Sequence, residues 1–496
     1  LYTDFSKMIF FCYLIGQEIR RGRFSDLIVV TDNLTLVNQI NVWAASQGLS
    51  SVIALKPGWQ LKERARSFTL GRMIYTLLRA IHYWLLVKAM FRSPASPATE
   101  YAVIATLLDE QCFSKDREYR DTYFGELPGF MSQSGVQVLI YGGILTSAFK
   151  ILRKLREKQP GLPIIPWHSY STILEILWAA WRTFQYYLRP IDLKGTAEID
   201  GIAVGHIVKE SIRGDFRSGH FFQSVWAYYS ARALARRVKV TTCVVPYENR
   251  SWEKMILAGL SRNSENLRTI GYHHAAVTPA HTHLLLGVQE TEVIPLPDTI
   301  VMMGEVTKEF LDKSGNYPDG KLRVGCALRQ GRQSQQSCMR RREKITNVLV
   351  ALASSVTEYE NVLLFLEKAF QDNGRYQVGI RPHPEFSLDR ALNRLPSLKL
   401  RYQLMDGPLE ENFDWADVVV YVSSTVGVNA LSTGIPVVSI DLREIMDYDP
   451  APIGSPLKWS VADPAQLIST LEKIEEVSDS EFEALQIRAA EFGRRY

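Results

Sequence analysis

The stretch "DWADVVVYVSSTVGVNALSTGIPVVSID", residues 414–441, decides the fold of this protein. Its apolar run Asp417–Val422 predicts a strand, and a helix is expected to follow from about Val426. Gly434 ends this helix, and a second apolar strand begins at once. Continuous apolar strands joined by a helix are typical of a parallel sheet that is buried on both faces. The stretch therefore predicts an α/β domain.

Three hydroxyl side chains, those of Ser423, Ser424 and Thr425, fall where this strand gives way to the helix. Ser and Thr are favoured at the start of a helix, so a plain capped helix is one interpretation. The other is a phosphate site, because hydroxyls and unbonded backbone N–H groups at a helix start attract an anion. A second segment of the chain favours the phosphate site.

That segment is "IRPHPE", residues 380–385, which ends a strand one strand–helix unit earlier. Pro382 and Pro384 restrict the backbone on both sides of His383, so the ring is oriented before any ligand arrives. In an open α/β sheet, ligands bind outside the carboxyl ends of the strands, so we expect His383 and the hydroxyls at one edge. A histidine there can donate a hydrogen bond to an anionic oxygen or protonate a leaving group, and Arg381 adds positive charge.

Similar apolar, β-branched runs recur along the whole chain, with helix-length segments between most of them. They fall into two series, at 26–32, 50–55, 100–108, 136–143, 162–167 and 239–248, and at 267–274, 298–305, 347–355, 375–383, 398–403, 416–424 and 434–441. Two such series predict two doubly wound α/β domains. We place the first domain at 1–264, the second at 265–478, and a final helix at 479–496 that can cross back to the first domain.

The order of these motifs resembles a known family. A strand with His-Pro, followed by a strand with Ser-Ser-Thr and a helix ending in "GIPVV", resembles the donor site of GT-B glycosyltransferases that use CMP-activated sugars. The chain is similar to bacterial sialyltransferases and Kdo transferases of capsule or lipopolysaccharide, and more loosely to polyglycerol-phosphate polymerases. "PYENRSWEK" (246–254), "GYHHAAVTP" (271–279) and "LPDTIVMMGE…VGCALR" (296–305 and 324–329) also resemble bacterial surface-carbohydrate biosynthesis proteins. The resemblance is at the level of motifs over about 240–441 and architectural elsewhere.

The resemblance implies that His383 and Pro384, together with Ser423 and Ser424, contact the phosphate of CMP. Many retaining GT-B enzymes with UDP or GDP donors carry two glutamates, separated by seven residues, around the last helix of this pattern. Here that helix contains Val428-Asn429-Ala430 and no such pair. This departure disfavours UDP and GDP donors and agrees with a CMP donor.

The implied function is the transfer of a 3-deoxy-ulosonic acid, Kdo or a sialic-acid-like sugar, from CMP to a glycan or lipid-linked glycan such as lipopolysaccharide O-antigen or capsule. We expect no metal or separate cofactor, because Arg381, His383 and the amides of 423–425 can offset the charge on the leaving CMP. Two alternatives remain open. One is a polyol-phosphate transferase of the same fold that uses a CDP-alcohol, and the other is a catalytically silent GT-B scaffold in polysaccharide assembly.

Candidate catalytic carboxylates lie in the first domain. In "VVPYENRSWEKMI" (244–256), Glu248 directly follows the last strand, and Glu253 lies in the first turn of the next helix. Either can act as a base toward the acceptor hydroxyl or as a nucleophile toward the sugar, with Glu248 favoured, or it can simply cap the helix. Asp121, in the charged and aromatic segment 116–130, is a third candidate on an acceptor-side loop or an ordinary surface residue.

Four histidines gather in "GYHHAAVTPAHTH", residues 271–283. We expect His273 and His274 to contact the donor or the acceptor, with ordinary packing as the alternative. A zinc site that includes His281 and His283 is disfavoured, because no carboxylate or cysteine completes a familiar spacing.

The composition is that of a globular protein, with 46% hydrophobic and 22% charged residues in a chain of 496. The net charge of +4 is small, which argues against a nucleic-acid partner. The five cysteines are scattered without a CxxC pair, so a reducing compartment is expected. Since no secretory signal is visible either, we expect a cytoplasmic protein.

Two apolar stretches, Leu70–Phe91 and Ile173–Pro190, invite a membrane interpretation. Charged residues such as Arg79 and Arg182 interrupt them, so neither supplies the roughly 18–20 uncharged residues of a membrane span. They are either amphipathic packing helices or a Trp- and Arg-rich face that rests on a membrane surface. The second alternative would make the protein peripheral at the inner face of the bacterial inner membrane.

Overall fold

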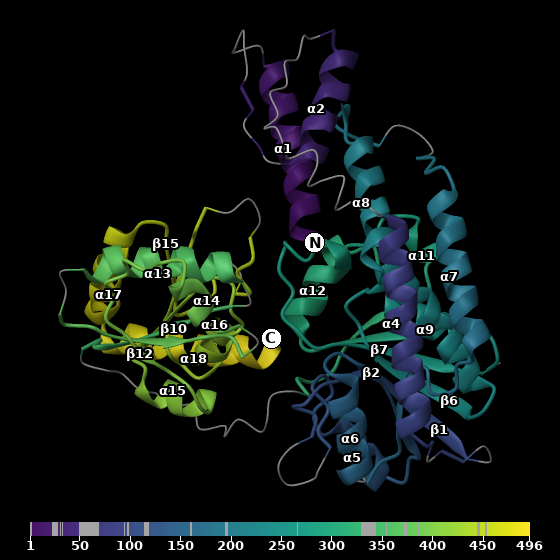
Figure 1. The fold of residues 1–496 in the computed structure, drawn as a ribbon. Helices are drawn as coiled ribbons and strands as arrows, with labels where there is room; N and C mark the ends of the chain where they lie inside the picture. The colour runs from purple at the N-terminus through teal and green to yellow at the C-terminus, as the bar shows by residue number, and fades with distance from the viewer. Residues whose placement is uncertain are drawn as a thin grey trace. The chain divides into compact units, whose positions relative to one another are not determined.

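The computed structural model describes residues 2–21, 28–29, 31, 33–48, 69–93, 95–96, 99–113, 119–158, 161–193, 197–264, 266–328, 344–353, 355–371, 374–384, 386–443, 447–451 and 454–496 (Figure 1). The strand expected at 50–55 and most of the strand expected at 26–32 lie outside these residues.

The chain divides into two compact units. Unit 1 comprises Leu1–Gly271 with Glu292–Asp298, and unit 2 comprises Tyr272–Thr291 with Thr299–Tyr496. The domain boundary expected at residue 264 and the arrangement of the domains across a cleft stay predictions.

The described residues form a first parallel sheet of seven strands in the order β3-β2-β1-β6-β7-β8-β9. The strands are β1 (Glu100–Leu108), β2 (Val138–Ile144), β3 (Ile164–Pro166), β6 (Lys239–Pro246), β7 (Arg268–His273), β8 (Thr299–Met302) and β9 (Leu322–Val324). In β1, Ile104 lies opposite Ile140 on one side and Val244 on the other. Ile104 is fully buried, because helices cover the sheet and both of its faces must be apolar. Numbered in this sheet alone, the first six strands follow the 3-2-1-4-5-6 order of the Rossmann fold.

Helices of unit 1 pack against this sheet or against one another. They are α4 (Thr69–Met90), α5 (Leu127–Gln133), α6 (Ala148–Lys158), α7 (Ile173–Leu188), α8 (Gly205–Ser218), α9 (His220–Ala235) and α10 (Ser251–Ser261). The two apolar stretches of the sequence are thus the helices α4 and α7. None of the described helices is long and apolar enough to cross a membrane.

A smaller cluster in unit 1 joins segments far apart in the sequence. It contains α1 (Tyr2–Arg20), α2 (Leu34–Ser46) and the hairpin of β4 (Glu198–Ile199) and β5 (Ile202–Ala203). Its core includes Trp43 and Ile202. The buried Gln39 is satisfied there, since its amide donates to Ala203 O (2.8 Å) and accepts from the backbone N–H of His206 (2.7 Å). This polar bridge fixes α2 against the start of α8.

Unit 2 contains a second parallel sheet, in the order β12-β11-β10-β13-β14-β15. Its strands are β10 (Asn347–Ala351), β11 (Gln377–Arg381), β12 (Gln403–Leu404), β13 (Val418–Tyr421), β14 (Val437–Ile440) and β15 (Lys458–Val461). The helices of this unit include α12 (Glu305–Ser314), α13 (Val356–Phe370), α14 (Asp389–Leu392), α15 (Leu409–Trp415), α16 (Val426–Ser432), α17 (Pro464–Glu476) and α18 (Asp479–Arg495), and the short α11 (Glu290–Val293) precedes them. In Figure 1, α13 and α18 lie on opposite sides of the strands. This strand order is again 3-2-1-4-5-6, so the predicted class is confirmed: α/β with two doubly wound, Rossmann-like sheets, as in the GT-B fold.

The predicted final helix is α18, which packs against α16. Gln486 is buried and donates to Gly434 O (2.9 Å), at the end of α16. At the other end of α18, Arg495 pairs with Glu305 and Glu309 of α12, both at 2.8 Å. These contacts lie within unit 2, and the crossing of α18 to the first domain stays a prediction.

Candidate functional site

The topology of unit 2 defines where a ligand can bind. From β10 the chain adds β11 and β12 on one side, and it then returns to add β13 on the other side. The loops after β10 and β13 are therefore expected to leave the sheet in opposite directions, and in sheets of this topology ligands bind where such loops diverge, at the carboxyl ends of the strands. The segments singled out in the sequence follow β11 and β13, which are the two neighbours of β10.

His383 is held at this edge through its backbone. Its N–H donates to the hydroxyl oxygen of Tyr359 (2.7 Å), and its carbonyl accepts from the N–H of Phe386 (2.9 Å). The His383 ring is half-buried and meets the Phe386 ring edge to face, with centroids 6.2 Å apart. The backbone of His383, which Pro382 and Pro384 restrict, is thus also held by Tyr359 on α13, and the expected orientation of the ring stays a prediction.

Ser423 is held by the residue that precedes Tyr359. Its hydroxyl donates to Glu358 Oε2 (2.5 Å), while Glu358 Oε1 accepts from the N–H of Ala353 in the loop after β10 (3.1 Å). Glu358 is only 7% exposed. Consecutive residues of α13 therefore bring together the two predicted donor-site segments, one through Tyr359 and His383, the other through Glu358 and Ser423.

The sequence interpretation missed Glu358. Its signal is the pattern Ser355-Val-Thr-Glu358 at the start of α13, since Ser followed three residues later by Glu marks a capping box. Ser355 does cap the helix, because its hydroxyl accepts from the N–H of Glu358 (3.3 Å). The Glu358 carboxylate instead turns to Ala353 and Ser423, where it positions the hydroxyl that we expected to face a phosphate.

The hydroxyls at the start of α16 have different surroundings. Ser424 is buried, and its Oγ accepts a long hydrogen bond from the N–H of Val426 (3.4 Å). Thr425 is exposed, and its side chain makes no capping bond. Gly427 allows close packing behind them, because a Cβ there would lie 2.6 Å from the Tyr421 ring. The structure thus gives Ser424 a local backbone role and leaves Thr425 at the surface.

Arg381 has protein partners of its own. Its Nη1 donates to Gly407 O (3.0 Å) and to the side-chain oxygen of Asn412. Burial lowers the pKa of Arg381 from its ordinary value. The guanidinium thus ties the end of β11 to α15 and to the segment that precedes it.

In unit 1, the corresponding switch point lies between β1 and β6, and Glu248 follows the end of β6. The Glu248 side chain is half-buried, and its Oε2 accepts from Arg250 Nε (3.0 Å). Asn249 lies between them in the left-handed region (φ 56°), where Asn is tolerated better than most residues. This tight turn places the Glu248 carboxylate at the edge of the sheet where ligands bind in such folds.

Glu253 is 2% exposed, and its carboxylate stabilises the turn at 248–250 from the buried side. It accepts from the backbone N–H groups of Glu248 (3.1 and 3.2 Å) and Arg250 (3.0 Å). Burial raises the pKa of Glu253 well above its ordinary value. Its contacts are those of a residue that fixes the loop, and its catalytic assignment stays a prediction.

Asp121 has a similar environment. It is 3% exposed and accepts from the N–H groups of Tyr123 (2.7 Å) and Phe124 (2.9 Å) and from the hydroxyl of Tyr119 (2.6 Å). Burial raises its pKa. These bonds stabilise a turn, and a role of Asp121 in catalysis is again untested.

The histidines of segment 271–283 lie at and beyond the end of β7. His273 and His274 are buried, with ring centroids 6.2 Å apart. His281 Nδ1 accepts from the N–H of Thr278 (3.0 Å). Among the described residues, no group of three or more His, Cys, Asp and Glu side chains is placed to hold a metal ion. Contact of His273 or His274 with a substrate stays a prediction.

Neither a protein-family model nor a curated protein matches this sequence. Several solved structures resemble it at low identity. The glycotransferase of kitacinnamycin has 12% identity and a TM-score of 0.45, covering 81% of this chain and 96% of the other. MurG of Acinetobacter baumannii (10%, 0.42) and the lipopolysaccharide outer core galactosyltransferase WaaB (8%, 0.42) each cover 79% of this chain and 95% of their own. Likeness at this level does not assign an activity.

Proposed function

We propose that this protein is a GT-B glycosyltransferase that transfers a 3-deoxy-ulosonic acid from CMP to a bacterial surface glycan. The observation that carries the proposal is the site in unit 2, where α13 connects His383 and Ser423 at the switch point of a Rossmann-like sheet. This edge is where such sheets bind nucleotides. His383 would donate to the phosphate, or protonate it as CMP leaves, and the backbone N–H groups of 423–425 with the hydroxyls of Ser424 and Thr425 would hold the other oxygens.

Glu248 would act in unit 1 as the base toward the acceptor hydroxyl or as the nucleophile toward the anomeric carbon. Two features support this assignment over Glu253 and Asp121. Glu248 is half-buried and follows the strand at the switch point, whereas the other two carboxylates are nearly inaccessible and accept backbone hydrogen bonds. A group that touches substrate must be reachable by it.

The test is the thermal stability of the full chain with CMP, CDP, UDP and GDP. A ligand at about 100 times its Kd stabilises the folded state by about 2.7 kcal/mol, so we expect CMP to raise the melting temperature most. Larger stabilisation by UDP or GDP would contradict the CMP donor. Preference for CDP and CDP-alcohols would favour the polyol-phosphate transferase, and no response to any nucleotide would favour the scaffold.

A further inference from the structure

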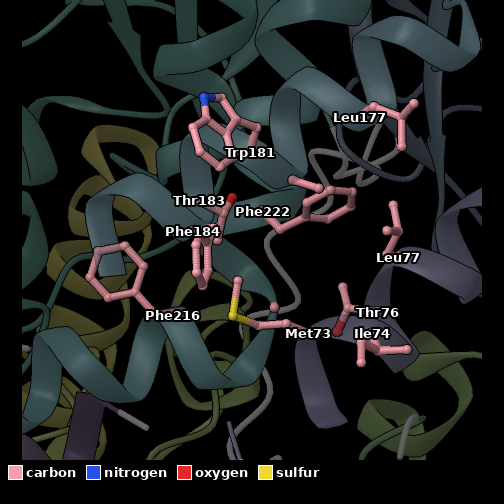
Figure 2. Close-up of a pocket in the computed structure, with 12 residues that line it drawn as sticks. Met73, Ile74, Thr76, Leu77, Leu177, Trp181, Thr183, Phe184, Phe216 and Phe222 are labelled. Carbon is pink, nitrogen blue, oxygen red and sulfur yellow. The ribbon is translucent and has the colours of Figure 1, made fainter. Parts of the chain in front are cut away.

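Unit 1 contains an apolar cavity of about 280 Å³ between α4, α7 and the α8–α9 junction. Figure 2 shows side chains from these helices around a common space, among them Met73, Leu77, Phe184, Phe216 and Phe222. This cavity belongs to neither sheet edge described above.

The polar groups in the lining need no ligand. Thr76 and Thr183 contribute hydroxyls, and each donates to a carbonyl of its own helix, Arg72 O and Ala179 O, both at 2.8 Å. A polar ligand group placed in this cavity would lose its bonds to water and find few partners among these side chains. The lining therefore favours an apolar occupant.

The cavity opens toward an exposed apolar face. Ile74 and Trp181 line the cavity and are nevertheless 50% and 49% exposed, so the mouth lies where they reach the surface. On α7, Leu174 (63%), Trp178 (53%) and Trp181 form one stripe at helical spacing. On α4, Leu78 (61%) continues the face. Because the opposite side of α7 is also buried in the protein, this helix is apolar on both sides, which is typical of a helix whose outer side contacts a second apolar phase.

The two helices of this face carry more cations than anions, although Lys88 at the end of α4 already donates to Ser169 O (2.7 Å). Helix α4 carries Arg72, Arg79 and Lys88 and no acidic residue. Helix α7 carries Arg182, and its one acidic residue, Glu175, serves the capping box at the start of the helix. Exposed Trp with flanking Arg matches the interface of an anionic bilayer, where indole rings lie at the headgroups and guanidinium groups contact phosphate.

We propose that the cavity takes one acyl chain of an anionic phospholipid and so anchors the α4–α7 face to a lipid bilayer. A single chain binds a membrane only weakly, and a second, electrostatic contribution is needed for stable attachment. The cavity would supply the first contribution and the arginines the second. The proposal does not depend on the glycosyltransferase assignment, and its test uses no nucleotide or sugar.

The test is co-sedimentation of the full chain with phosphatidylcholine vesicles, with and without about 30 mol% phosphatidylglycerol. We expect binding to the anionic vesicles that weakens with salt. Arg72→Gln with Arg79→Gln should weaken it by about tenfold or more, whereas the control pair Arg262→Gln with Arg268→Gln, exposed elsewhere in unit 1, should not. Equal binding to neutral vesicles, or the same loss in both pairs, would overturn the charge contribution.

The cavity itself is tested by Leu177→Gln, which places an amide at the mouth, and by Ala180→Met, which fills it. Native mass spectrometry should find one phosphatidylglycerol per wild-type chain and none in either variant. Phe130→Gln removes an exposed ring from α5 and should keep the lipid. Retention of lipid by both folded cavity variants would overturn the proposal. The proposal would also be overturned if the wild-type chain did not bind vesicles and instead formed a dimer through this face.

Discussion

Three carboxylates proposed from the sequence differ mainly in what surrounds them. Glu253 and Asp121 are buried and accept backbone N–H groups, so their charge serves the loops that contain them. Glu248 is half-buried beside Arg250 and follows a strand end. At the scale of residues, the same functional group is thus a loop anchor in two places and a candidate for chemistry in the third.

His383→Ala should reduce sugar transfer by about 10²-fold or more, the scale of lost acid catalysis. The chain should still fold, since the ring is half-buried and the backbone bond to Tyr359 remains. Tyr359→Phe is the matched variant, because it keeps the imidazole and removes its backbone support, and it should lose less activity. Turnover rates at saturating donor measure both. If the alanine variant turned over at the wild-type rate, His383 would have a structural role and no catalytic one.

His168 predicts a pH dependence of stability. Its ring stacks on Trp226 with centroids 3.4 Å apart, and burial lowers its pKa well below the ordinary 6.5. The unfolded chain therefore binds more protons than the folded chain below about pH 6.5, and stability is lost as the pH falls through this range, by up to about 1.4 kcal/mol per pH unit.

The comparison is His168→Asn, since Asn tolerates the left-handed backbone at this position (φ 68°). Urea unfolding between about pH 7.5 and about pH 5 should show that the free energy of unfolding falls less with acidification in the variant than in the wild type. Parallel curves for the two proteins would show that His168 titrates normally.

At the scale of elements, the close approach of helices depends on small residues at particular points. A Cβ at Gly259 of α10 would lie 2.5 Å from the backbone oxygen of Tyr228 in α9 and 2.8 Å from the Cβ of Ala231. A Cβ at Gly129 of α5 would meet nothing within 4 Å. The first glycine allows two helices to touch, and the second is a half-buried helical position with open space beside it.

Gly259→Ala should therefore destabilise the chain by about 1–3 kcal/mol through overpacking. Gly129→Ala should be neutral or stabilising by up to about 1 kcal/mol, because alanine favours the helix. The midpoints of chemical denaturation distinguish them. Equal effects of the two substitutions would mean that α9 and α10 can separate at little cost.

At the scale of the molecule, the two units divide the proposed chemistry. The nucleotide is assigned to the edge of unit 2 at His383 and Ser423, whereas Glu248 belongs to unit 1. The two candidate sites belong to different units and different sheets, so binding and chemistry should respond to different substitutions.

Glu248→Gln should abolish transfer and leave the affinity for CMP nearly unchanged, because glutamine keeps the shape but cannot act as base or nucleophile at neutral pH. Calorimetric titration with CMP and a transfer assay measure the two properties. Near wild-type transfer by this variant would mean that Glu248 only stabilises the turn with Arg250. The catalytic carboxylate would then have to be Glu253 or Asp121.

The sequence also shows where local patterns mislead. The run at 398–403 predicts a full strand, but only Gln403–Leu404 pairs, as β12. Strands β9 and β15 are absent from the expected series, because β9 is short and partly exposed and β15 alternates polar with apolar residues. Edge strands have one partner and one exposed side, so they need not be continuous apolar runs.

By itself the sequence determined the α/β class, the presence of two doubly wound sheets and the positions of His383, Ser423 and Glu248 at strand ends, because these follow from local periodicity and turn chemistry. It grouped the runs at 267–274 and 298–305 with the second sheet, whereas they form β7 and β8 of the first sheet. Only the tertiary structure decided which of these residues share a support. Glu358 reaches Ser423 across 65 positions of the chain, and that contact exists because β13 pairs with β10 after the intervening strands have been added on the other side. The apolar cavity has the same origin, since helices α4, α7, α8 and α9 meet around it from separate parts of the sequence. The local sequence pattern predicts the helix or strand in which a residue lies, but the residue's neighbours in space depend on how the strands of the sheet are connected.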